Sequence, residues 1–321
     1  MVGEGPVTIH EYDSEWELKS KKQAPITGHI VMHDAAITRS KYLIHQPPTS
    51  FDAMSFTLGL KSAISSVQFD AAKPSTFHLV PRDGGEGVSV EAEGAFILQV
   101  VNAFDDAEGN VVADVIEMPR MPGGEVGGSA WQDSFSFSRD IPPAQLVRWT
   151  ISPGSQSASK EVVSERFQAF PSINPYVASV RHSFVYTAAA AQGAGVAPLQ
   201  SVLKTDMATR EVTEHAFKAT EFCTEPIFVP RLEGMSEDDG YLVTQVFDSE
   251  KDQSSLVILD GKDLSRGEVS RVRMRNPLPY SIYGCWADGE VPTAEDYNKG
   301  KLAAAFKRNS WNEVGGGLSL L

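Results

Sequence analysis

The feature that most limits the fold of this chain is a series of short strand-like runs, each ended by a polar or glycine-containing turn. Residues 7–12 alternate between apolar and polar side chains, residues 77–80 end in the turn 81–85, and residues 241–247 lead to a polar turn. Alternation with a period of two puts one face of a strand against a core. Turns at even spacing predict an all-β sandwich, barrel or propeller with few helices.

Further runs of this kind follow one another along the chain, at residues 88–92, 95–101, 111–116, 146–151, 161–168, 183–188, 199–204, 212–216, 227–230 and 255–260. We expect one β domain over residues 1–321, with a C-terminal tail at residues 289–321. The best helical candidate, residues 294–306, lies in that tail. Residues 51–66 are expected to form an irregular or short helical connection.

Charge and cysteine content limit the partners and the compartment. The formal net charge is -14, from 42 acidic and 28 basic residues, which argues against nucleic acid and anionic membrane surfaces. No stretch of ~18 uninterrupted apolar residues predicts a transmembrane helix. No signal peptide is visible at residues 1–6, and two cysteines make no disulfide framework. We therefore expect an intracellular protein, cytoplasmic or plastid, in a reducing compartment.

A histidine in the segment 31–38 is the first candidate for chemistry. His33 lies between Met32 and Asp34, and on a regular strand it would point to the face opposite both. One interpretation is an ordinary core or rim histidine, and the other is a metal ligand. His29 lies four positions earlier, so the same strand would place it on the face of His33. This segment alone leaves both interpretations open.

Several stretches carry recognisable motifs in a fixed order from about residue 7 to residue 288. They read M-H-D-A-A-I-T at 32–38, P-R-D-G at 81–84, N-A-F-D at 102–105, F-P-S-I-N-P-Y at 170–176, R-H at 181–182 and E-P-I-F-V-P-R at 225–231. Together they resemble the carotenoid cleavage oxygenase family, which includes lignostilbene dioxygenases and the retinoid isomerase of the eye. Each motif is weak by itself, but their shared order makes the resemblance specific.

The resemblance implies a seven-bladed β-propeller, incomplete at its N-terminus in this chain, with a ferrous ion on its axis. Four histidines would hold the iron, and carboxylates would orient three of their imidazoles. The implied activity is O2-dependent cleavage of a conjugated double bond in a carotenoid, apocarotenoid or stilbene. Neutral imidazoles suit such a site because they bind Fe(II) without adding negative charge.

Carried over position by position, the resemblance leaves one of the four ligands. The family's first histidine lies upstream of this chain, the second matches His33, and the third and fourth positions hold Gln99 and Tyr283. The carboxylate expected before Phe170 is replaced by Ala169, whereas the carboxylate before Pro226 is present as Glu225.

The chemistry of these replacements predicts that the family's iron activity is impaired or lost. A carboxamide is a weak donor, and a phenol with a reference pKa of ~10 binds iron best as an anion, which favours the ferric state. One imidazole does not hold Fe(II) against solution. A replacement site of His29, His33 and Glu225 is one alternative. In the other, Gln99 and Tyr283 hydrogen-bond each other or a water in the vacated space.

Three functions remain open at this stage. The chain is an active Fe(II) dioxygenase, a non-catalytic relative that binds an apolar small molecule such as an apocarotenoid, or a propeller used for protein assembly. Unpaired propeller edges would favour self-association. No catalytic residue is assigned, and Asp105–Asp106 and Asp238–Asp239 are interpreted as solvated turn carboxylates.

Overall fold

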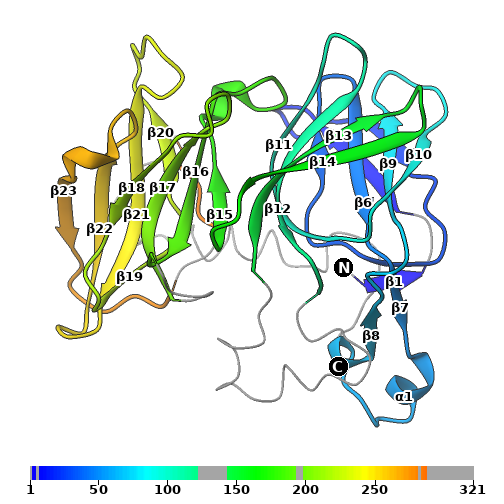
Figure 1. The fold of residues 1–321 in the computed structure, drawn as a ribbon, viewed down its shortest axis with the longest axis horizontal. Coiled ribbons are helices and arrows are strands. Elements are labelled where there is room, and N and C mark those ends of the chain that lie inside the picture. The colour runs from blue at the N-terminus through cyan, green and yellow to red at the C-terminus, as the bar shows by residue number, and fades with distance from the viewer. Residues whose placement is uncertain (1, 5–6, 122–142, 193–197, 281–282, 288–321) are drawn as a thin grey trace. The chain divides into compact units, whose positions relative to one another are not determined.

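The computed structural model describes residues 2–4, 7–121, 143–192, 198–280 and 283–287, which form antiparallel sheets with very little helix (Figure 1). The chain divides into two units, residues 1–284 and 285–321, and the sheets that the structure describes lie in the first. The prediction of an all-β fold is confirmed. The expected tail and its helix at 294–306 lie outside the described residues.

Four larger sheets are each built from nearly consecutive strands, so most neighbours are joined by hairpins. The first contains β5 (Ala36–Ile37), β6 (Lys41–Gln46), β9 (Ser75–Pro81) and β10 (Val88–Ala92). The second contains β11 (Phe96–Asp105), β12 (Val111–Met118), β13 (Gln145–Ser152) and β14 (Ser157–Ser164). This organisation agrees with a β-propeller, whereas the number of blades stays a prediction.

The third and fourth sheets follow in chain order. The third contains β15 (Gln168–Ser172), β16 (Phe184–Ala190), β17 (Leu199–Asp206) and β18 (Val212–Ala216). The fourth contains β19 (Glu221–Cys223), β21 (Gly240–Asp248), β22 (Gln253–Asp260) and β23 (Glu268–Arg273), with β20 (Ile227–Pro230) also paired to β21.

Smaller elements complete the first unit. Three two-stranded sheets pair β1 (Val2–Glu4) with β4 (His29–Val31), β2 (Thr8–Tyr12) with β3 (Leu18–Gln23), and β7 (Thr49–Phe51) with β8 (Val67–Phe69). The helical elements are α1 (Ala53–Thr57) and the 3-10 turns η1 (Ile64–Ser66), η2 (Pro175–Val177) and η3 (Leu264–Arg266). The short helical connection expected at 51–66 is therefore present. No helix among the described residues is long and apolar enough to cross a bilayer.

The core lies between the faces of successive sheets. Phe77 and Trp149 come from the first and second sheets, and their ring centroids are 5.1 Å apart in an edge-to-face contact. Tyr186 and Phe228 come from the third and fourth sheets and stack at 5.2 Å. Burying each such side chain contributes on the order of 1.5–3 kcal/mol, so these contacts hold neighbouring sheets together.

Side chains at the turns explain where several strands end. Asp106 accepts hydrogen bonds from the backbone N–H groups of Glu108 and Asn110 at 3.0 and 2.8 Å, which closes the β11–β12 hairpin. The interpretation of Asp238 and Asp239 as solvated was wrong, because Lys204 lies 2.7 Å from Asp238 and Lys262 lies 2.9 Å from Asp239. Asp238 and Asp239 therefore form ion pairs with lysines.

Candidate functional site

Two positions taken from the family motifs meet directly, although they lie far apart in the sequence. The hydroxyl of Tyr283 is 3.1 Å from Nε2 of His33, and the two ring centroids are 6.2 Å apart. Partial burial, followed by the nearby carboxylates of Asp34 and Glu225, raises the pKa of Tyr283. The phenol therefore stays protonated at neutral pH and can donate its hydrogen to the imidazole.

The segment that carries His33 is not the regular strand expected from the sequence. Strand β4 ends at Val31 and β5 begins at Ala36, so His33 lies in the connection between them. The carboxylate of Asp34 accepts the backbone N–H of Ala35 and that of Val100, both at 2.8 Å. This side chain replaces ladder hydrogen bonds and ties the connection to β11, which explains the break.

His29, the other histidine expected near this site, belongs to a different sheet. His29 is the first residue of β4 and pairs with Glu4 across the β1–β4 sheet. The side chain of His29 lies outside the described residues. The replacement site of His29, His33 and Glu225 therefore stays a prediction.

Glu225 holds backbone instead of an imidazole. Its carboxylate accepts the N–H of Tyr283 at 2.9 Å and also the N–H of Gly284. Tyr283 has a φ of 63°, the left-handed region that a tyrosine rarely adopts. A Cβ at position 284 would lie 3.0 Å from Oε1 of Glu225 and 2.9 Å from Cδ1 of Ile227. Glu225 thus fixes a strained backbone that aims Tyr283 at His33.

Gln99 and Ala169 lie on neighbouring strands, at the start of the second and third sheets. Gln99 is buried, and its Oε1 accepts the N–H of Phe170 at 2.8 Å. Phe170 has a φ of 55°, and its ring meets the ring of Tyr283 edge-on at 6.5 Å. Ala169 is buried beside Phe170 and offers no carboxylate. The hydrogen bond of Gln99 is therefore made to Phe170 rather than to Tyr283.

The positions derived from the motifs consequently gather in one region, which we call the His33–Tyr283 site and define as His33, Gln99, Phe170, Glu225 and Tyr283. His33 contacts Tyr283, and Phe170 contacts both Tyr283 and Gln99. The backbone N–H of Val100, next to Gln99, donates to the carboxylate of Asp34, next to His33. The sequence placed these residues in one site only through the resemblance, and their contacts in space agree with that placement.

The donor atoms that the structure describes at this site are engaged by other groups of the protein. In the part of the chain that the structure describes, no group of three or more His, Cys, Asp or Glu side chains could hold a metal. Nε2 of His33 is engaged by a phenol, Oε1 of Gln99 by a peptide N–H, and the carboxylate of Glu225 by two. Fe(II) needs several free nitrogen or oxygen donors, whereas these atoms are engaged by a phenol or by backbone N–H groups.

A buried polar network near the site was not foreseen. Nδ2 of Asn102 lies 3.1 Å from Nδ1 of His182, and Nε2 of His182 lies 3.1 Å from Oδ2 of Asp114. Two nitrogens of Arg148 each lie 2.8 Å from the Asp114 carboxylate. Burial alone would raise the pKa of Asp114, but the bonds from Arg148 and His182 outweigh it and lower that pKa. The network joins β11, β12 and β13 to the segment before β16.

The motifs at 102–105 and 181–182 gave the only sequence signal for this network. They marked Asn102 and His182 as part of the resemblance but gave them no role, and no spacing along the chain indicated Asp114 or Arg148.

Comparison with known proteins gives consistent matches. The family model described as retinal pigment epithelial membrane protein matches residues 1–288. The apocarotenoid-15,15'-oxygenase of Synechocystis sp. is 32% identical over 281 residues, which are 88% of this chain and 56% of that protein. The isoeugenol monooxygenase of Pseudomonas putida is 26% identical, over 79% of this chain and 54% of that protein.

Solved structures match as well. A cobalt-substituted Synechocystis ACO is 31% identical with a TM-score of 0.82, over 89% of this chain and 60% of that one. An ACO/RPE65 chimera is 30% identical with the same TM-score of 0.82 and the same coverage of 89% and 60%. This chain therefore spans between half and two thirds of the length of these relatives.

Proposed function

This chain belongs to the family of the retinal pigment epithelial membrane protein and the carotenoid oxygenases, and from this premise we propose that it binds an apolar conjugated molecule without cleaving it through iron. The ligand class follows from the relatives, which are named as carotenoid, apocarotenoid and isoeugenol oxygenases. The loss of cleavage follows from the side chains that this chain has at the His33–Tyr283 site.

The observation that carries the proposal is the 3.1 Å contact between the Tyr283 hydroxyl and Nε2 of His33. The family's iron binds imidazoles, and here a neutral phenol occupies the donor atom of the retained imidazole. The raised pKa of Tyr283 disfavours the phenolate that would bind iron well. Direct pairing satisfies both polar groups without a metal.

The same residues are suited to hold an apolar molecule. The ring of Phe170 offers a face or edge for a conjugated chain or ring, and both Tyr283 and His33 are exposed at its side. The phenol and the imidazole can each exchange their mutual hydrogen bond for one to a hydroxyl or carbonyl end group of the ligand. The ligand is therefore held by an aromatic contact and one polar contact.

Ligand binding is tested by titrating an apocarotenal into the purified chain and following the fluorescence of its five tryptophans. We expect saturable quenching that a chelator does not change, and recovery of the uncleaved apocarotenal after incubation in air with Fe(II). Absence of quenching at micromolar ligand contradicts the binding part. Appearance of a shorter aldehyde contradicts the loss of cleavage.

The metal part is tested with Co(II), whose visible absorption reports imidazole ligation. The chain itself should show no such band, whereas the variant Gln99→His/Tyr283→His, which offers three imidazoles with His33, should gain one. The matched control Gln23→His/Tyr176→His adds two imidazoles at exposed positions and should stay without a band. A band in the unaltered chain, or equal spectra for the variant and its control, contradicts the proposal.

Assembly through a sheet edge is a second candidate, supported by the outer strand of the fourth sheet. Among the described strands β23 (Glu268–Arg273) pairs with β22 alone, and its Val269 and Val272 are 54% and 50% exposed. Size-exclusion chromatography with light scattering over a range of concentrations tests it. A dimer that Val269→Lys dissociates would support assembly, and a monomer at every concentration would exclude it.

A further inference from the structure

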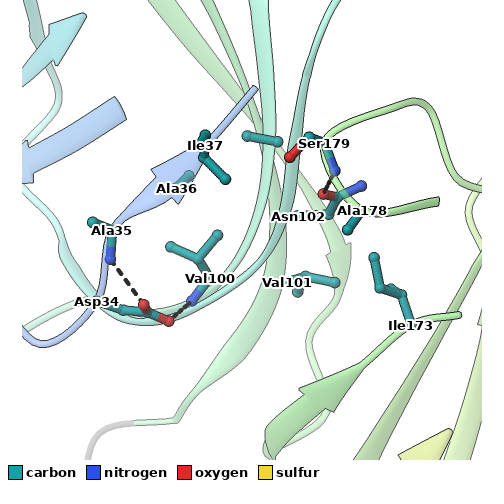
Figure 2. A pocket seen from close by; sticks show the side chains of 11 residues that line it. Asp34, Ala35, Ala36, Ile37, Val100, Val101, Asn102, Ile173, Ala178 and Ser179 are labelled. Carbon is teal, nitrogen blue, oxygen red and sulfur yellow. Dashed lines mark hydrogen bonds between the residues drawn. The ribbon is translucent and has the colours of Figure 1, made fainter. Parts of the chain in front are cut away.

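A hollow of about 250 Å³ is lined by residues that include none of the His33–Tyr283 site, and Figure 2 shows the side chains around it. Its walls come from three segments, residues 34–37, residues 100–103 of β11, and residues around η2. Asp34 follows His33 and Val100 follows Gln99, but neither His33 nor Gln99 lines the hollow. The hollow therefore has its own walls and can be considered separately from the proposed function.

Three polar side chains line the hollow, those of Asp34, Asn102 and Ser179. Asp34 and Asn102 are already engaged, as the dashed lines in Figure 2 indicate. Oδ1 of Asn102 accepts the N–H of Ser179 at 2.9 Å, and its Nδ2 donates to the carbonyl oxygen of Val180 at 2.8 Å. The two carboxylate oxygens of Asp34 each accept a backbone N–H. A ligand finds few free hydrogen-bonding side chains there.

The same hydrogen bonds make the walls rigid. Asp34 ties the segment before β5 to β11, and Asn102 ties β11 to the segment after η2. A register shift in β11 between Val100 and Asn102 breaks strict alternation, and Val100 and Val101 both line the hollow. A hollow whose three walls are cross-linked needs little rearrangement to accept a ligand.

The remaining side chains around the hollow are small and, apart from that of Ser179, apolar. Methyl groups of Ile37, Val100, Val101 and Ile173 face the space together with alanines (Figure 2). Sites for drug-sized ligands start near 300 Å³, so this hollow takes a smaller molecule. The size therefore suits one ring with a short substituent. The carboxylate of Asp34 at the wall disfavours an anion.

We propose that this hollow binds a neutral, compact apolar molecule of about one substituted ring. It is too small for a whole polyene, so its occupant differs from the long ligand that a carotenoid-type site takes. The hollow is a second ligand site of this chain, and it does not depend on whether the His33–Tyr283 site binds iron or an apocarotenoid.

The test uses n-propylbenzene as the neutral probe and benzoate as its charged counterpart, with methyl NMR of the full chain. We expect n-propylbenzene to shift the methyl signals of Ile37, Val100 and Ile173 in a saturable way, and to leave those of the distant core residue Leu242 unchanged. Benzoate should bind at least about tenfold more weakly. Equal affinity for the two probes, or shifts spread evenly over the protein, overturns the proposal.

Variants that fill the hollow with a larger side chain give a second test of the proposal. Ala178 lines it, is exposed, and has extended backbone angles that phenylalanine adopts freely, so Ala178→Phe should reduce the affinity for n-propylbenzene about tenfold or more. Ala107→Phe, in the exposed β11–β12 turn, is the matched control and should bind as the unaltered chain does. A second filling variant, Ala35→Phe, covers a failure of the first to fold. Unchanged affinity in a folded filling variant overturns the proposal.

Discussion

The carboxylate of Glu225 accepts the backbone N–H of Tyr283 at 2.9 Å, across a separation of 58 residues. It also accepts the N–H of Gly284, and Tyr283 is held in a left-handed conformation beside His33. A residue that the resemblance would assign to orienting an imidazole therefore orients a phenol through its backbone. The hydrogen bonds of Glu225 to the 283–284 backbone therefore keep the site ordered, although it has only His33 of the histidines that the resemblance implies.

The first prediction concerns the charge of Glu225. Glu225→Gln keeps the shape but turns an amide NH2 toward one of the two N–H donors, so we expect a loss of about 1–3 kcal/mol in unfolding free energy. Because the Glu225 carboxylate helps to raise the pKa of Tyr283, that pKa should fall in the variant. Denaturant titration and a spectrophotometric titration of tyrosine measure the two effects. Glu233→Gln, in an exposed turn, should change neither.

The second prediction concerns Gly284. A methyl group there would lie 3.0 Å from the Glu225 carboxylate and 2.9 Å from Ile227, so Gly284→Ala should lose about 1–3 kcal/mol by overpacking. Gly154→Ala is the control, because a Cβ at 154 has nothing within 4 Å. Thermal and denaturant unfolding compare the two. Equal stabilities would contradict the close approach of Glu225 to the 283–284 backbone.

The third prediction concerns the buried ion pair of Asp114. Asp114→Asn leaves the guanidinium of Arg148 and the imidazole of His182 without their anion, and should cost about 3–5 kcal/mol. Glu161 is an ion-pair partner of Arg210, and its side chain is 59% exposed. Glu161→Gln, which removes its charge, should cost less than ~1 kcal/mol. Denaturant unfolding measures both. Similar costs for the two variants would mean that the Asp114 network is not buried as described.

The fourth prediction concerns acid stability. His45 is buried, its Nε2 has no hydrogen-bond partner, and burial with the neighbouring His78 lowers its pKa to about 3 from 6.5. Between these values the unfolded chain binds a proton that the native state excludes, so the unfolding free energy falls as pH drops from 6.5 toward 3. The loss attributable to His45 is at most about 5 kcal/mol.

Replacing His45 isolates this contribution. His45→Leu should flatten the dependence of unfolding free energy on pH between about 6 and 4, because the leucine binds no proton in either state. His10→Gln, on the outer hairpin strand β2, should keep the slope of the unaltered chain. An unchanged slope in His45→Leu would show that other groups cause the acid sensitivity.

The sequence predicted the class of fold because alternation and turns are local. Strand candidates such as 111–116 and 199–204 recur as β12 and β17, and the alternating run at 7–12 contains β2. The gathering of His33, Gln99 and Tyr283 could be expected only from the motif order. Periodicity alone wrongly placed His33 on a regular strand, because the Asp34 contact to Val100 spans 66 residues. For the same reason, spacing along the chain gave no indication of the backbone role of Glu225 or of the pairing of His182 with Asp114.

We infer that the donor atoms at the positions matched to the family's metal ligands are engaged within the protein, His33 by Tyr283 and Gln99 by Phe170. Anaerobic loading of the full chain with Fe(II), followed by desalting and metal analysis, tests it most directly. We expect the chain to retain far less than one equivalent of iron, and no more than a His33→Ala variant retains. One equivalent of iron that is retained by the unaltered chain and lost in His33→Ala would contradict it.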